Sequence, residues 1–129
     1  MSQQPKHILV VDDEENSRVS LSRLLLQEGY QVDSVADGDE ALTFVASKDV
    51  HLVISDINMP RMDGLELLRE LNSSYPRISV IMITAYGEVE SYLDAMRFGA
   101  MEYIHKPVRL DELKLAMQRI FTPAPLLAD

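Results

Sequence analysis

The stretch Ile8-Leu9-Val10-Val11-Asp12-Asp13 decides the fold, because an apolar run of strand length ends directly in a pair of carboxylates. Later runs of the same kind end at Asp56, at Thr84 and at Lys106. Parallel neighbouring strands place their carboxyl ends on one edge of a sheet, and open α/β folds bind ligands at that edge. We therefore expect these side chains to meet in one site, although they lie far apart in the chain.

The whole chain repeats this unit of strand and helix. Apolar runs begin near residues 7, 31, 51, 78 and 101, and a segment with helical periodicity follows each of them. Such alternation is typical of an α/β fold in which helices cover both faces of a parallel sheet. We expect a doubly wound sheet of five strands with five helices, the helices starting at Asp37 and spanning about 14–28, 65–73, 88–98 and 110–121.

Local signals indicate the ends and the buried faces of these helices. Gly29 and Gly99 follow the first and fourth helices, as glycine often does at a helix C-terminus. Asp37 is expected to cap the second helix, with Glu40 as its capping-box partner. The strands read as continuous apolar runs, which predicts burial on both faces. The helix positions expected in the core are Leu21, Leu24, Leu25, Ala41, Leu42, Val45, Leu113, Ala116, Met117 and Ile120.

Composition limits the classes of function. The 129 residues are 47% hydrophobic and 26% charged, as expected of one globular domain, and the lack of cysteine excludes disulfides, cysteine-ligated zinc and thiol catalysis. Acidic residues outnumber basic ones by 21 to 12, and the net charge of −9 argues against direct contact with nucleic acid. Because no apolar stretch approaches the ~18 residues of a membrane span and residues 1–6 lack the apolar core of a signal peptide, we expect a soluble, cytoplasmic protein without membrane contact.

The residue types at the strand ends suit phosphoryl transfer with a hard metal ion. A carboxylate such as Asp56 can accept a phosphoryl group as an acyl phosphate. The carboxylates of Asp12, Asp13 and Asp56 would repel one another if they were clustered, so a bound cation explains such a cluster better than a contribution to stability does. Mg²⁺ (or Mn²⁺) prefers oxygen ligands of this kind. Lys106 would add a positive charge for the phosphate, and Thr84 would donate a hydrogen bond to a phosphoryl oxygen. No organic cofactor is expected.

Each of these residues also has a purely structural interpretation. Asp12 and Asp13 could cap the first helix, and Asp56 could form a turn. Thr84 could cap the next helix or fill space, and Lys106 could be a solvated surface residue. All of them lie at matching positions of successive strands, so these structural interpretations would have to coincide several times. The joint pattern favours a site.

Five motifs together resemble the receiver domain of two-component response regulators. Val10-Val11-Asp12-Asp13-Glu14 resembles the acidic pair of that family, and Ser55-Asp56-Ile57-Asn58-Met59-Pro60 with Met62-Asp63-Gly64 resembles its phosphoacceptor loop. Ile83-Thr84-Ala85 and Lys106-Pro107 resemble its hydroxyl and lysine signatures. The resemblance divides the chain into a receiver domain at 1–121 and residues 122–129, which are either a tail or the start of a linker.

The resemblance implies a flavodoxin-like sheet with strand order 2-1-3-4-5. It implies that Asp56 is phosphorylated, that Asp13 and Asp56 bind Mg²⁺ directly with help from Asp12, and that the backbone carbonyl of Asn58 completes the protein ligands. The phosphodonor would be a histidine kinase or a histidine phosphotransfer protein, with small acyl phosphates as substitutes. The Lys106–Pro107 peptide would be cis.

The resemblance further implies a switch that catalyses its own phosphorylation and dephosphorylation and is otherwise no enzyme. Thr84 would move toward the phosphoryl group, and Tyr103 would turn inward into the vacated space. The fourth helix, fifth strand and fifth helix would respond and act on an output domain or partner protein, with homodimerisation on phosphorylation as one form of output. Transcriptional control is expected if an output domain follows. The sequence leaves open the cognate kinase, its signal and the lifetime of the phosphorylated form.

Two other functions use similar residues. An aspartate-nucleophile phosphatase of the haloacid-dehalogenase type would carry Asp-x-Asp at the nucleophile, whereas position 58 is Asn, and the chain has no room for a cap domain. An interaction module that works without phosphorylation would lack part of the acidic, hydroxyl and lysine set, which is complete here. Nucleotide binding is disfavoured because no glycine-rich turn follows the first strand.

Overall fold

A computed structural model describes residues 5–59, 62–85 and 89–121, apart from the side chains of residues 89–91. Within these residues five parallel strands form one sheet in the order β2-β1-β3-β4-β5. Strands and helices alternate along the chain: β1 (His7–Val11), α1 (Glu15–Gln27), β2 (Gln31–Val35), α2 (Gly38–Ser47), β3 (Leu52–Asp56), α3 (Gly64–Ser74), β4 (Ser79–Thr84), α4 (Val89–Arg97), β5 (Glu102–His105) and α5 (Leu110–Phe121).

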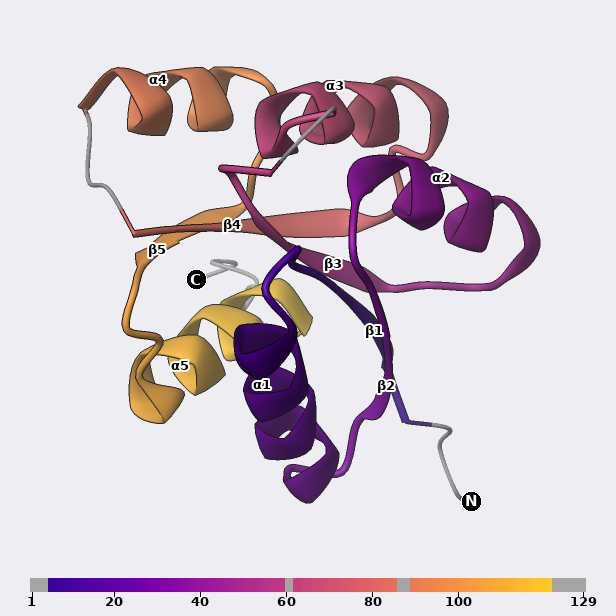
Figure 1. The fold of residues 1–129 in the computed structure, drawn as a ribbon, viewed down its shortest axis with the longest axis vertical. Coiled ribbons are helices and arrows are strands. Elements are labelled where there is room, and N and C mark those ends of the chain that lie inside the picture. The colour runs from indigo at the N-terminus through magenta and orange to yellow at the C-terminus, as the bar shows by residue number, and fades with distance from the viewer. Residues whose placement is uncertain (1–4, 60–61, 86–88, 122–129) are drawn as a thin grey trace, which may run out of the picture.

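Helices cover both faces of the sheet. In Figure 1, α1 and α5 lie on one side of the sheet, and α2, α3 and α4 lie on the other. Successive side chains of a strand point to opposite faces, so Leu9 and Val11 join the core under α2 and α3, while Ile8 and Val10 join the core under α1 and α5. A central strand of this fold must therefore be apolar at every position, which is why β1 reads as an unbroken apolar run.

The predicted doubly wound α/β fold and its strand order are confirmed. The fifth helix has the predicted bounds, and α1 ends one residue before its C-cap Glu28, followed by Gly29 at φ +96°. The fourth helix begins at Val89, and Glu88, the predicted start, lies outside the described residues. Of the predicted core positions, Leu24, Leu42 and Ile120 are half-buried and the others are buried.

The prediction that strands are buried on both faces is wrong for the edges of the sheet. Every residue of β1 and β3 is buried, but Gln31, Asp33 and Ser34 of β2 are exposed, and β5 buries only Ile104 among its four residues. An edge strand has one neighbour instead of two, and less helix surface lies over it. Polar side chains are therefore tolerated there.

The helix caps differ in part from the prediction. Asp37 caps α2 by accepting a hydrogen bond from Glu40 N (2.8 Å), but the Glu40 carboxylate accepts from Ala36 N (2.9 Å), one residue before the cap. A complete capping box lies instead at α3, between Asp63 and Glu66. The Lys106–Pro107 peptide is cis, as expected. None of the helices among the described residues combines the length and the apolar character needed to cross a bilayer.

Candidate functional site

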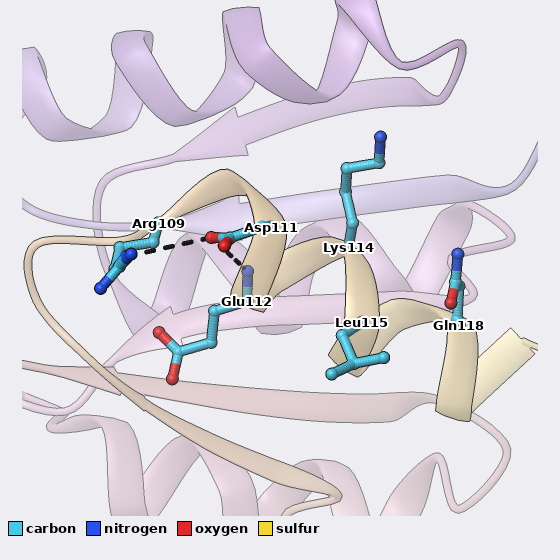
Figure 2. Close-up of a pocket in the computed structure, with 6 residues that line it drawn as sticks. All are labelled: Arg109, Asp111, Glu112, Lys114, Leu115 and Gln118. Atoms are coloured by element: carbon cyan, nitrogen blue, oxygen red, sulfur yellow. Dashed lines mark hydrogen bonds and ion pairs between the residues drawn. The ribbon is translucent and has the colours of Figure 1, made fainter.

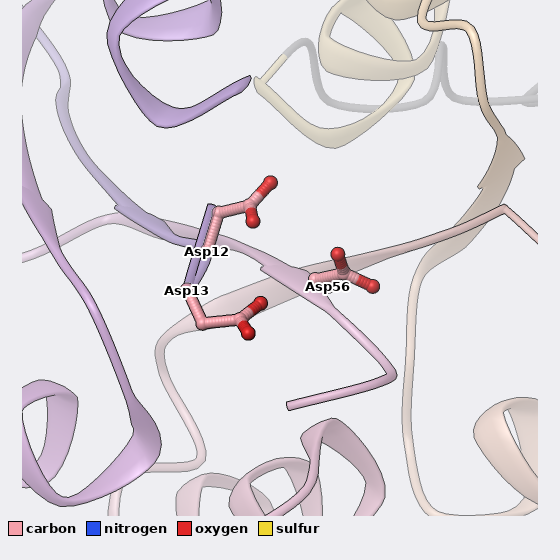
Figure 3. A group of neighbouring side chains, drawn as sticks. All are labelled: Asp12, Asp13 and Asp56. Carbon is pink, nitrogen blue, oxygen red and sulfur yellow. The ribbon is translucent and has the colours of Figure 1, made fainter. Parts of the chain in front are cut away.

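The strand order brings two acidic segments side by side. Strands β1 and β3 are neighbours, with Val11 opposite Ser55. Asp12 follows β1 directly and Asp56 is the last residue of β3, so their carboxyl ends share one edge of the sheet. This is the point where the chain, after winding to β2 on one side of β1, continues to β3 on the other. Figure 3 shows the side chains of Asp12 and Asp13 extending from the end of β1 toward the side on which Asp56 lies.

The three carboxylates form a candidate cation site. Each of Asp12, Asp13 and Asp56 offers an oxygen, and the three oxygens lie within 4.8 Å of one another. Asp12 and Asp56 are 6% and 8% exposed, and Asp13 is exposed. Two nearly buried carboxylates beside an open one suit Mg²⁺, which binds through one or two carboxylates and keeps several water ligands. The residues present therefore fit the metal that the sequence predicts.

Lys106 closes the site from β5. Its Nζ donates to Asp56 Oδ2 at 2.8 Å and to Asp12 Oδ2 at 3.4 Å. The ammonium thus already lies beside the carboxylate that was predicted to be the nucleophile. A single positive charge shared by two partly buried carboxylates offsets part of their repulsion, and it lies where a phosphoryl oxygen on Asp56 would need a partner.

The charges in the site shift two pKa values. Burial raises the pKa of the Asp12 carboxyl, and the hydrogen bond from Glu14 N and the charge of Lys106 offset only part of that effect. For Lys106, burial lowers the pKa, but the hydrogen bond to Asp56 and the charges of Asp56 and Asp12 outweigh burial and raise it. Lys106 therefore stays charged at neutral pH, while Asp12 is harder to ionise than an ordinary aspartate.

Backbone groups hold the carboxylates in place. Glu14 N donates to Asp12 Oδ1 at 2.9 Å, and Asn58 N donates to Asp56 Oδ1 at 3.1 Å. Arg18 Nη1 donates to the carbonyl oxygen of Asp12 at 2.8 Å. The bonds from Glu14 N and Asn58 N each use one oxygen of a carboxylate. On Asp56 they leave the other oxygen facing Lys106.

Gly64 packs directly against the backbone of the predicted phosphoacceptor. A Cβ on this residue would lie 2.7 Å from Ile57 Cα and closer still to the carbonyl oxygen of Asp56. Gly64 N also donates to Ile57 O at 2.8 Å. The start of α3 is thereby pinned beneath the loop that follows Asp56, and a side chain at position 64 would push that loop away.

The remaining predicted residues lie close to the site or border it. Thr84 is 1% exposed at the end of β4, and its carbonyl accepts from Lys106 N at 2.7 Å. Asn58 is exposed in the loop after Asp56. Tyr103 of β5 is half-buried, with its ring 5.4 Å from the rings of both Tyr92 and His105 in edge-on geometry. Their predicted roles as hydroxyl donor, carbonyl ligand and switch stay predictions.

Sequence reasoning missed two residues of the site, Arg18 and Gly64. Gly64 lies inside the motif Met62-Asp63-Gly64, but the sequence of that motif does not show that the Gly64 Cα faces the backbone of Asp56. Arg18 follows Asp12 by six residues, which on a helix beginning near residue 14 points a long side chain back toward the helix N-terminus. That spacing was a usable signal.

Two hollows lie near the site and beyond it. One of about 320 Å³ adjoins the site on the α1 side, and its lining includes Asp12, Leu21, Lys106 and Pro107. The other lies along α5 and the residue before it (Figure 2), where Arg109 Nε is 3.9 Å from Asp111 Oδ1 and Glu112 N donates to the same carboxylate. The second is an exposed helix face, and its charged groups are partly paired along the helix itself.

Comparison with known proteins gives consistent matches. A family model described as the response regulator receiver domain matches residues 8–118. The regulatory protein AtoC of Escherichia coli (strain K12) is 44% identical over 112 residues, which are 87% of this chain and 24% of AtoC. The chain thus spans about a quarter of the length of that relative.

Two solved structures share the fold and a related sequence. The response regulator protein TrrA of Thermotoga maritima, in complex with Mg²⁺-BeF, has 40% identity and a TM-score of 0.82, covering 89% of this chain and 98% of that one. The beryllofluoride-activated NtrC4 receiver domain dimer has 32% identity and a TM-score of 0.84, covering 89% of this chain and 95% of that one.

Proposed function

The chain belongs to the response regulator receiver domains, and from this membership we propose that Asp56 is the residue that accepts the phosphoryl group. A receiver domain is a phosphorylation switch, and here its acidic pocket consists of Asp12, Asp13 and Asp56. The observation that carries the proposal is the position of the Asp56 carboxylate. One of its oxygens lies within 4.8 Å of an oxygen of Asp12 and of Asp13, and Lys106 Nζ is 2.8 Å from Asp56 Oδ2.

The side chains divide the work of phosphoryl transfer. A carboxylate oxygen of Asp56 would donate an electron pair to the phosphorus of a phosphohistidine, the P–N bond would break, and the imidazole would leave. Bound Mg²⁺, held by Asp13 and Asp56 with Asp12 and the Asn58 carbonyl, would neutralise charge on the phosphoryl oxygens. Lys106 would then pair with a phosphoryl oxygen, and Thr84 would donate to another. Attack of water on the phosphorus would return the carboxylate and release inorganic phosphate.

The partner that supplies the phosphoryl group would be a histidine kinase or a histidine phosphotransfer protein. A receiver domain implies such a kinase. We propose that this receiver meets its kinase in the cytoplasm. The output is a separate proposal, because AtoC is about four times longer than its match here. Residues 122–129 lie outside the described residues, so a receiver at 1–121 with a tail or linker at 122–129 stays part of this proposal.

The responding surface would be formed by α4, β5 and α5. Thr84 ends the strand beside β5, and Tyr103 of β5 packs between Tyr92 of α4 and His105, so a move of Thr84 would reach this surface through Tyr103. NtrC4, a structural relative, forms a dimer when activated with beryllofluoride. We propose that phosphorylation acts here on an output domain or partner protein, or through a homodimer of this kind.

Labelling with acetyl phosphate tests the assignment. Incubation with acetyl phosphate and Mg²⁺ should add one phosphoryl group to the wild-type chain in intact-mass spectrometry, and none without Mg²⁺. The Asp56→Asn variant, which keeps the shape of the side chain, should stay unmodified. An unmodified wild type, or equal labelling of Asp56→Asn, would contradict the proposal. Steady hydrolysis of a generic phosphomonoester would favour the phosphatase alternative.

A further inference from the structure

We propose that Arg18 of α1 is a positioning residue for the metal site, which it serves by holding the peptide that joins Asp12 to Asp13. Its Nη1 donates to the carbonyl oxygen of Asp12 at 2.8 Å. Arg18 does not touch the metal in this proposal. It acts through the two aspartates, and the inference rests on the proposed function because it assumes that this site binds Mg²⁺.

The hydrogen bond from Arg18 to Asp12 links the first turn of α1 back to the end of β1. Arg18 N donates to Glu14 O at 3.0 Å, so the backbone of Arg18 belongs to the first turn of α1. Its side chain reaches back past that turn to the end of β1. The loop between β1 and α1 is thus tied at one end by the helix itself and at the other by the guanidinium.

Arg18 completes the set of bonds that fix Asp12. The N–H of Asp12 donates to Val35 O at 3.2 Å, and its carboxylate accepts from Glu14 N at 2.9 Å. The carbonyl of Asp12 lies in the same rigid peptide plane as the N–H of Asp13. Holding that carbonyl therefore fixes the direction in which the chain enters Asp13, whose side chain is exposed.

An arginine suits this task for two reasons. Its planar guanidinium is pre-organised, so less side-chain entropy is lost for each hydrogen bond it forms than with lysine. It is also permanently charged, and a charge-assisted hydrogen bond is stronger than a neutral one. Both reasons predict a local effect on the peptide that the guanidinium holds, and experiment can separate this effect from a general effect of net charge.

The test is Mg²⁺ binding to the full chain, measured by isothermal titration calorimetry. Loss of groups that orient metal ligands costs metal affinity by roughly 10-fold to 100-fold. Arg18→Met, which keeps the length of the side chain, should raise the Kd for Mg²⁺ about 10-fold by the same principle. Arg23→Met is the matched control, because Arg23 is exposed on the same helix and its loss changes the net charge equally. Its Kd should stay at the wild-type value.

A second measurement separates positioning from a general loss of structure. With acetyl phosphate, Arg18→Met should need a higher Mg²⁺ concentration for half-maximal labelling but should reach the wild-type rate at saturating Mg²⁺, because Asp56, Thr84 and Lys106 are unchanged. Its melting temperature without Mg²⁺ is measured in parallel. If Arg18→Met does not fold, Arg18→Lys takes its place, since the ammonium keeps the charge but not the planar fork.

The outcomes decide between the explanations. A wild-type Kd in the folded Arg18 variant would overturn the inference, and so would an equal loss in Arg23→Met, because the effect would then be one of net charge. A lowered labelling rate at saturating Mg²⁺ with an unchanged Kd would also overturn it. A wild-type chain that binds no Mg²⁺ and takes no phosphoryl group would contradict the proposed function itself.

Discussion

Asp12 shows how one residue in this site is stabilised by some contacts and destabilised by others. Its carboxylate accepts from Glu14 N and faces the Lys106 ammonium, yet burial still raises its pKa. The folded protein therefore binds this proton more tightly than the unfolded chain does. By linkage, ionised Asp12 destabilises the metal-free protein at neutral pH, and this effect is relieved as the pH falls through the raised pKa. A bound cation removes the same penalty.

The stabilisation by Mg²⁺ should therefore depend on pH through Asp12. Mg²⁺ bound to the ionised carboxylates of the folded state would raise the melting temperature by mass action. We expect this increase to be largest at neutral pH and to shrink as the pH falls toward the raised pKa of Asp12. Thermal unfolding followed by circular dichroism, with and without Mg²⁺ at several pH values, measures it.

The Asp12→Asn variant is the control for this pH dependence. Without Mg²⁺ it should melt at a higher temperature than the wild type at neutral pH, because the penalty of the ionised carboxylate is gone. With Mg²⁺ it should gain less, and its gain should change less with pH. An identical pH profile in the variant would show that Asp12 is not the group responsible.

At the scale of whole elements, sequence reasoning succeeded where the signal is local or repeated along the chain. The bounds of α5 followed from its helical periodicity, and the cap at Asp37 followed from residues three positions apart. It failed where the outcome depends on a neighbour in space. The exposure of β2, for example, depends on its edge position.

The same limit applies to the site. That Asp12, Asp13, Asp56 and Lys106 meet was predictable because each lies at or just after the carboxyl end of a strand, and parallel strands align those ends. The contact of Gly64 with the backbone of Asp56 was not, since it depends on the path of the loop between β3 and α3. Patterns of strand ends thus predict which groups meet, whereas the groups that hold them in place come from loop geometry.

A polar pair, His7 and Asp33, links β1 to β2 away from the acidic site. His7 of β1 is 6% exposed, with Nε2 2.7 Å from Asp33 Oδ2 of β2 and Nδ1 2.9 Å from Asp49 O. Both ring nitrogens of His7 therefore face an acceptor oxygen. His7 N also donates to His51 Nδ1 at 3.0 Å. A buried polar group of this kind depends on its partners.

Asp33→Asn should therefore destabilise the fold more than an ordinary surface substitution does. Loss of a charged partner from a nearly buried group costs about 1–3 kcal/mol. Asp49→Asn is the matched control, because it removes the same charge from an exposed side chain while the backbone oxygen that faces His7 stays. Urea unfolding should show the loss for Asp33→Asn only. Equal free energies of unfolding for the two variants would mean that the His7–Asp33 contact contributes nothing.

At the scale of the whole molecule, the proposed α4–β5–α5 surface takes in both layers of helices, because α4 lies on one side of the sheet and α5 on the other (Figure 1). The surface carries several large apolar side chains that are one-third to over one-half exposed, namely Tyr92, Leu93, Met96, Met101 and Leu115. A phosphoryl group must favour the active state strongly to switch the protein, because shifting an equilibrium from 1:99 to 99:1 needs a difference in interaction free energy of about 5.5 kcal/mol. Two charge-assisted hydrogen bonds, at about 1.5–3 kcal/mol each, supply most of it.

Methionine methyl groups report this change at different distances from the site. Met82 is buried on β4 beside Gly64, Met96 lies on α4, Met101 precedes β5, and Met117 is buried against the opposite face of the sheet. In spectra of protein labelled at the methionine methyl carbons, Mg²⁺ with beryllofluoride as a phosphoryl analogue should shift the signals of Met82, Met96 and Met101. The signal of Met117 should shift less, because Met117 lies in the core on the face of the sheet opposite Met82.

Substitution of Tyr103, which we propose as the coupling residue, makes this prediction specific. Tyr103→Ala leaves the acidic cluster and Lys106 intact, so the shift of Met82 beside the site should persist, while the shifts of Met96 and Met101 should shrink. Asp56→Asn should abolish all of them, since the analogue needs the acceptor carboxylate. If the shifts of Met96 and Met101 survive in Tyr103→Ala, the phosphoryl group reaches the surface by another route, such as the backbone bond from Lys106 N to Thr84 O. If Met117 moves as far as Met96, the response extends through the cores on both faces of the sheet.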